Sequence, residues 1–180
     1  ALMLLHHSRA AARFDAEGQI ILMDDQDRGL WNRDMIGEGL ALIDKAIRHR
    51  RRGPYQVKAA IGALHARAAA PDDVDWAQIE ALYQALEVME PSPIVTLNRA
   101  VAVSKTQGPE AALAMMEPLA DQLGGYFNFF GARGALLKQL GRAAEARDAF
   151  NQAIALATTP AQAAHIRQHL DQLAAEASRA

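Results

Sequence analysis

Apolar side chains recur at intervals of three and four residues along nearly the whole chain of 180 residues. This spacing places them on one face of an α-helix, where a neighbouring helix can bury them. The breaks between the runs are short and fall at Gly, Pro or Asp, as in tight turns between antiparallel helices. The pattern therefore predicts an all-α fold of stacked helix hairpins with about nine helices. The predicted helices cover residues 2–14, 30–48, 54–69, 76–89, 94–106, 109–123, 126–140, 142–157 and 161–177.

One segment near the N-terminus departs from the helical pattern. Residues 15–18 read Asp-Ala-Glu-Gly and predict a turn, and residues 19–23 predict a short strand or a buried loop. Asp27 stands where the N-cap of the following helix is expected. We therefore divide the chain into an N-terminal helical part, residues 1–75, and a series of paired helices, residues 76–180. Together they are expected to form one continuous array.

The second part carries features of the tetratricopeptide repeat, a helix pair of about 34 residues in which small and aromatic side chains let one helix nest against the next. The best copy spans residues 126–160, and a partial match lies at residues 79–91. The side chains that carry the best copy are Phe130, Gly134, Gly141, Ala146, Phe150 and Ala153. A generic helical bundle is the alternative. A stacked array of this kind, an α-solenoid, presents a concave surface that binds peptides, helices or other domains.

Composition excludes several classes of function. The chain has no cysteine, which removes disulfides, thiolate metal sites and thiol nucleophiles. The formal net charge is −2, from 19 basic and 21 acidic residues, and supplies no broad positive field for nucleic acid. No apolar stretch predicts a signal peptide or a membrane span, so a cytoplasmic location is expected.

The side chains that could support chemistry are few. His165 and His169 lie four residues apart, the spacing of helical zinc ligands, but no third ligand follows in the required pattern. The sequence contains no serine elbow and no phosphate-binding loop. We therefore expect no enzyme, no cofactor and no metal site. The alternative is a helical domain that binds a metal through these histidines, or a small molecule in a pocket of Tyr126, Phe127 and Phe130.

The most concentrated charge is the basic run Arg48-His49-Arg50-Arg51-Arg52. In one interpretation, Arg50, Arg51 and Arg52 dock an acidic partner surface or a phosphate. In the other, the cations stabilise the negative end of the preceding helix dipole, before Gly53 and Pro54 stop the helix.

Five stretches together resemble a known family: residues 2–9 (Leu-Met-Leu-Leu-His-His-Ser-Arg), 24–31 (Asp-Asp-Gln-Asp-Arg-Gly-Leu-Trp), 53–56 (Gly-Pro-Tyr-Gln), 91–100 (Pro-Ser-Pro-Ile-Val-Thr-Leu-Asn-Arg-Ala) and 125–142. Their sequence and order are similar to the C-terminal extension of bacterial RNA polymerase sigma factors of the extracytoplasmic-function type. The resemblance covers almost the entire chain. It implies a tetratricopeptide-like region that follows the domains that bind core polymerase and promoter DNA.

The resemblance also implies a function and partners. The extension is expected to tune transcription initiation through contacts with the sigma domains, core RNA polymerase or a separate small YCII-like protein, and to meet promoter DNA only through other domains. A stand-alone tetratricopeptide adaptor is a further alternative. The resemblance directs attention to two parts of the chain as interaction sites, and their candidate residues are Asp25, Asp27, Arg28, Trp31, Tyr126, Arg133 and Arg142.

Overall fold

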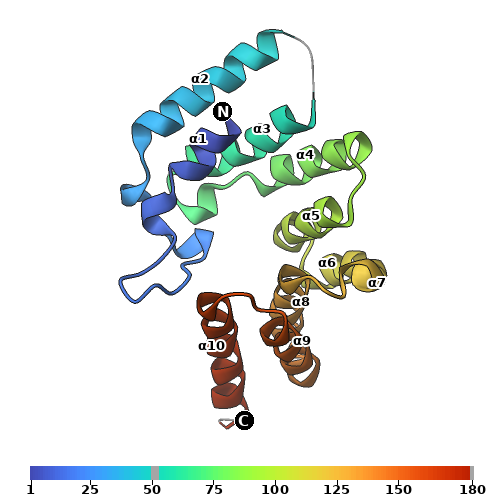
Figure 1. The fold of residues 1–180 in the computed structure, drawn as a ribbon. Helices are drawn as coiled ribbons and strands as arrows, with labels where there is room; N and C mark the ends of the chain where they lie inside the picture. Colours follow the sequence, from blue (N-terminus) through green and yellow to red (C-terminus); the bar gives the residue numbers. More distant parts are fainter. Residues whose placement is uncertain (50–52, 179–180) are drawn as a thin grey trace. The chain divides into compact units, whose positions relative to one another are not determined.

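The computed structural model describes residues 1–49 and 53–178, and in them the predicted all-α fold of helix hairpins is confirmed (Figure 1). The described ranges contain no strand. With α6 and α7 taken as one interrupted helix, the α-helices correspond one to one with those predicted. The helices are α1 (Leu2–His7), α2 (Arg33–Arg48), α3 (Pro54–Arg67), α4 (Trp76–Met89), α5 (Pro93–Thr106), α6 (Pro109–Met116), α7 (Ala120–Leu123), α8 (Phe127–Gln139), α9 (Ala143–Ala155) and α10 (Pro160–Ala177).

The chain forms two compact units, Ala1–Val95 and Thr96–Ala180. The division falls within α5, and the boundary drawn from sequence, between residues 75 and 76, lies inside the first unit at the start of α4. None of the helices in the described residues combines the length and apolar character needed to cross a membrane.

The first helix is shorter than the predicted range of residues 2–14, because α1 ends at His7. The cause is a tertiary contact: the carbonyl of Ser8 accepts a hydrogen bond of 2.8 Å from the amide of Asn32, which belongs to a distant part of the chain. The amide of Ala12 instead donates to the carbonyl of Arg9, which makes a 3₁₀ turn over residues 10–12. The tertiary contact thus replaces the helical hydrogen bond that Ser8 would otherwise accept.

The segment predicted as a strand or a buried loop is a loop with a single isolated bridge between Phe14 and Ile20. The prediction that Asp27 caps the long helix is wrong. Its side chain accepts from the amide of Gly29 and caps a 3₁₀ turn over residues 28–30. Asn32 is the N-cap of α2, since its side chain accepts a hydrogen bond of 3.0 Å from the amide of Met35.

The predicted helix of residues 109–123 is interrupted in its middle. Pro118 has no amide hydrogen, so it cannot donate the helical bond to the carbonyl four residues earlier. Residues 117–119 accordingly form a 3₁₀ turn between α6 and α7.

Within the first unit, α3 packs against α1, α2 and α4 (Figure 1). The core is built on one side of α3 and includes Trp31, which is only 2% exposed. The apolar stripe of α2 enters the same core through Ile36 and Ile43. The remaining buried members are Leu5, Ala12, Ala59, Ala63 and Ala66.

Within the second unit, α9 packs against α8 and α10. The turn between α8 and α9 is a Schellman motif: the amide of Arg142 donates to the carbonyl of Leu137, and Gly141 adopts a φ of +70°. Gly134 of α8 lies directly against the ring of Phe150 of α9. A Cβ at Gly134 would lie 2.6 Å from ring carbons of Phe150, which is fully buried. The close approach of the two helices therefore requires glycine at this position.

We expect Gly134→Ala to lower the free energy of unfolding by about 1–3 kcal/mol, because the added methyl group overpacks the contact with Phe150. Gly131→Ala is the matched control on the same helix, since its Cβ would lie 3.6 Å from Ile166, an ordinary contact. Alanine favours a helix interior by about 1 kcal/mol over glycine. Gly131→Ala should therefore be neutral or stabilising. Urea unfolding followed by circular dichroism measures both, and equal effects would contradict the close approach.

Candidate functional site

Arg28 anchors the segment of residues 24–31 to the C-terminal end of α3. Its Nη1 donates hydrogen bonds to the carbonyls of His65, at 2.8 Å, and Ala68, at 3.0 Å. Carbonyls at a helix C-terminus lack helical partners and carry the negative end of the helix dipole. A guanidinium suits this position because it supplies several donors and a positive charge. The two hydrogen bonds hold residues 24–31 against the end of α3, which comes much later in the sequence.

Two guanidinium groups lie near the ring of Trp31. The centre of its ring is 4.6 Å from the Arg28 Cζ and 5.7 Å from the Arg9 Cζ. Arg9 donates to the side-chain carbonyl of Gln26 at 3.4 Å, and Gln26 donates to the carbonyl of Ile21 at 3.1 Å. These contacts join the start of the chain, the loop and the beginning of α2 into one partly buried cluster, which we call the Arg28 cluster (Arg9, Gln26, Arg28, Trp31 and His65).

The Arg28 cluster contains buried nitrogen atoms without a hydrogen-bond partner: Nε and Nη2 of Arg28, Nε1 of Trp31 and Nδ1 of His65. Unpaired buried donors are costly, and positive charge is concentrated around them. Burial, with a smaller effect of the charges of Arg9 and Arg28, lowers the pKa of His65 to about 4, whereas Asp24 opposes the shift. His65 is therefore neutral in the folded protein at neutral pH.

Of the residues in this segment predicted to make interactions, the structure buries two and exposes two. Arg28 and Trp31 are buried inside the first unit, 7% and 2% exposed. Asp25 and Asp27 are exposed, and Asp27 caps the turn before Trp31. Arg28 and Trp31 thus fix the fold of the segment, and of these four candidate residues the two carboxylates are the exposed ones.

Arg28→Met should destabilise the first unit by about 2–4 kcal/mol, because it leaves the carbonyls of His65 and Ala68 buried without their donor. Arg33→Met is the matched control: Arg33 is exposed, and its one hydrogen bond goes to the carbonyl of Arg28. Its cost should stay below about 1 kcal/mol. Both tryptophans of the chain, Trp31 and Trp76, lie in the first unit, so urea unfolding followed by tryptophan fluorescence reports on that unit. Equal costs would argue against the anchoring role.

The first unit should lose stability as the pH falls from about 6.5 to 4. Over this range the unfolded chain binds a proton at His65 that the folded chain, with its lowered pKa of about 4, does not. The contribution is up to about 3 kcal/mol. In His65→Gln this contribution disappears, so the difference in free energy of unfolding between wild type and variant should change with pH across this window.

Tryptophan fluorescence of urea-unfolded samples between pH 7 and pH 4 measures this difference. His7→Gln, at an exposed position, serves as the control that leaves the dependence in place. A constant difference between wild type and His65→Gln would exclude the proposed protonation behaviour of His65.

In the second unit, the structure brings Arg133 and Arg142 into one surface network with Glu117 and Glu145. Arg133 lies 3.5 Å from Glu117, and Arg142 pairs with Glu145 through two hydrogen bonds. The hydrogen bond from Arg142 lowers the pKa of Glu145. Tyr126 is partly buried against the core, and its hydroxyl accepts a hydrogen bond from Asn128 at 3.0 Å. The two arginines are thus matched by carboxylates of their own unit.

The other predicted features have the following places. His165 and His169 are neighbours, with ring centres 5.0 Å apart, and His169 stacks on Phe150. In the described residues, no group of three or more potential ligands could hold a metal ion. Phe127 and Phe130 pack against the core of the second unit. Arg50, Arg51 and Arg52 lie outside the described residues.

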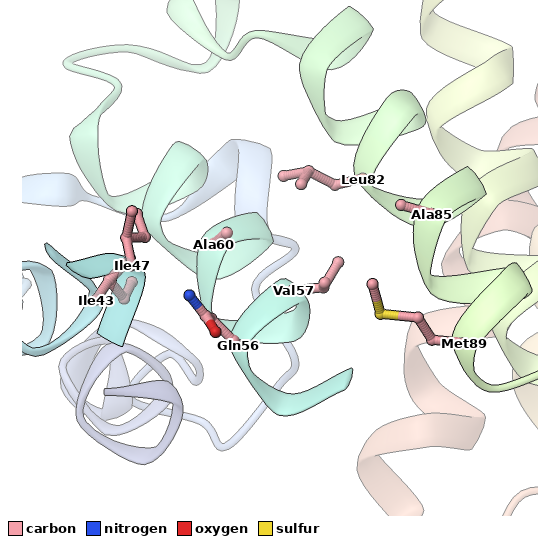
Figure 2. Close-up of a pocket in the computed structure, with 8 residues that line it drawn as sticks. All are labelled: Ile43, Ile47, Gln56, Val57, Ala60, Leu82, Ala85 and Met89. Carbon is pink, nitrogen blue, oxygen red and sulfur yellow. The ribbon is translucent and has the colours of Figure 1, made fainter. Parts of the chain in front are cut away.

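An apolar groove in the first unit was not predicted from sequence. It has a volume of about 680 Å³ and lies over α3, with side chains of α2 and α4 on either side (Figure 2). Ile47 of α2 and Met89 of α4 are 57% and 40% exposed at its walls. The sequence pattern did not indicate this groove, because apolar residues such as Ile47 and Met89 fall on the apolar stripe of a helix and are therefore predicted to be core. The lining residues are Ile43, Ile47, Gln56, Val57, Ala60, Leu82, Ala85 and Met89.

Comparison with known proteins gives two matches. Residues 1–47 match a family described as a family of unknown function, DUF6596. An uncharacterized protein of Rhizobium meliloti (strain 1021) is 68% identical over 176 residues, which cover 98% of this chain and 42% of that protein. The chain thus spans less than half the length of this relative. No solved structure matches.

Proposed function

We propose that this chain is a regulatory, protein-binding region of a bacterial sigma factor of the extracytoplasmic-function type. It acts by binding and not by catalysis, in the cytoplasm, and without a cofactor. It tunes transcription initiation through contacts with the sigma domains, core RNA polymerase or a small YCII-like protein. Promoter DNA is contacted by other domains of the same protein.

The observation that carries the proposal is the behaviour of the stretch at residues 24–31, which is central to the resemblance. This stretch is irregular, yet Arg28 and Trp31 anchor it from within. The anchoring leaves Asp25 and Asp27 exposed at a fixed position. Fixed carboxylates on a rigid support favour specific contact with a partner, because little conformational entropy is lost on binding.

A further observation supports a binding role. The relative from Rhizobium meliloti is more than twice as long as the matched region, which is consistent with a segment that serves a larger protein.

The test is transcription in vitro with purified core RNA polymerase, from a promoter that the full-length protein recognises. We expect deletion of residues 1–180 to change the amount of transcript at least about fivefold, a coupling of about 1 kcal/mol. A loss would identify the region as an activator, and a gain as an inhibitor. Addition of the separate 1–180 region should partly reverse the change.

Two outcomes would contradict the proposal. If the full-length protein does not direct core polymerase to any promoter, it is not a sigma factor. If transcription with and without residues 1–180 is equal, in the presence of the cognate YCII-like protein as well as in its absence, the region has no regulatory role.

A further inference from the structure

We propose that the apolar groove of the first unit binds an amphipathic helix of a separate protein, with acidic residues beside its apolar face. The inference concerns a surface of this chain and holds whether or not the chain acts in transcription. It depends on the shape of the groove, its chemistry and the charge at its edge.

The shape suits a helix. Lining residues on α4 lie at positions 82, 85 and 89, so the wall repeats at each helical turn. At 1.5 Å per residue this wall is about 10 Å long, enough for two turns of a bound helix. On the opposite wall, Ile43 and Ile47 of α2 are one turn apart. Helices that bind in grooves place side chains at the same spacing.

The chemistry of the groove disfavours an extended peptide. Its floor and walls are α-helices, whose backbone groups are mostly paired within each helix. The only polar side chain in the lining is Gln56. An extended peptide would therefore lose the hydration of its backbone amides without gaining partners. A helix satisfies its own backbone and offers only side chains.

The open form of the groove disfavours a small ligand. Sites for small molecules bury about 70–90% of the ligand surface. Here Ile47 and Met89 stay partly exposed at the walls, so a small ligand would be covered on one side only. The apolar surface also continues beyond the groove, since a second hollow shares Ile43 and Gln56 and reaches Tyr55, which is 75% exposed. A surface of this extent fits a macromolecular partner.

The charges that adjoin lining residues in the sequence favour acidic flanks on the partner. Glu90, which follows Met89, is paired with Lys58 at 2.8 Å, and Asp44 lies 4.0 Å from Arg67. These two anions, each next to a lining residue in the sequence, are thus matched by cations of α3. Arg48, which follows Ile47, is exposed, and no ion pair of Arg48 is found among the described residues. An acidic residue beside the apolar face of the partner would complement Arg48.

The same charge argues against a second copy of this chain as the occupant. A two-fold interface brings the same patch of both copies together. The Arg48 side chains of both copies would then border one interface, which like charges disfavour.

The test uses three synthetic 18-residue helical peptides, each labelled with fluorescein, and fluorescence anisotropy with the 1–180 chain. The first carries leucines on one face and glutamates beside them, the second replaces the glutamates by lysines, and the third replaces the leucines by serines. We expect the first peptide to bind with a dissociation constant in the micromolar range. The second should bind at least about fivefold more weakly, and the third should not bind.

Variants locate the binding. Ile47→Glu should weaken the first peptide at least about tenfold, because it removes an apolar contact and adds a like charge. Val88→Glu is the matched control, since Val88 is 82% exposed and does not line the groove. Arg48→Glu should reverse the preference between the glutamate and lysine peptides. Tryptophan fluorescence unfolding verifies that each variant is folded.

Three results would overturn the proposal: no saturable binding of the glutamate peptide, equal weakening by Ile47→Glu and Val88→Glu, or a preference for the lysine peptide. A dimer in sedimentation velocity that Ile47→Glu dissociates would show that a second copy fills the groove instead. None of these results depends on the transcription assay, so failure here and failure of the proposed function are distinguishable.

Discussion

The hydrogen bonds from the Arg28 guanidinium to the end of α3 are the interaction on which the first unit depends. They bring a cation to carbonyls that have no helical partner, and they place Arg28 over the ring of Trp31. Trp31 then fills the core beside Ile36 and Ile43 of α2. The amide of the next residue, Asn32, donates a hydrogen bond to the carbonyl of Ser8, and α1 ends there. The path of the N-terminal segment thus depends on the hydrogen bonds that the buried guanidinium of Arg28 makes to the end of α3.

Periodicity predicted the helices and most of their limits, because the apolar stripe, Gly and Pro act within a few residues. The interruption at Pro118 and the close contact of Gly134 with Phe150 have signals of this local kind. The burial of Arg28 has none. Arginine in a polar stretch reads as a surface residue, and its partner Ala68 lies 40 positions away. The early end of α1 was missed for the same reason, since it depends on the distant Asn32.

The groove illustrates a second limit of sequence reasoning. An apolar stripe shows which face of a helix avoids water, but not whether the chain itself covers that face. Along α2, Ile43 is buried, whereas Ile47 on the same stripe is mostly exposed. The candidate residues chosen by resemblance show the reverse case. Arg28 and Trp31 were expected to contact a partner, but both are buried inside the first unit. Arg28 and Trp31, which hold the N-terminal segment in shape, are thus distinct from the exposed Ile47 and Met89 of the groove that we propose binds a helix.

The anchoring of Arg28 also bears on the order in which the protein is made. A ribosome releases the chain from its N-terminus, so residues 1–32 emerge well before the end of α3, which holds the carbonyls of His65 and Ala68. Until residue 68 has left the ribosome, Arg28 has no acceptor there and Trp31 has no complete core to enter. Chains fold domain by domain during synthesis, and exposed apolar surface invites aggregation in the interval. Residues 1–32 therefore stay exposed until the end of α3 has been synthesised. A pause in translation before residue 68 would lengthen the time of exposure.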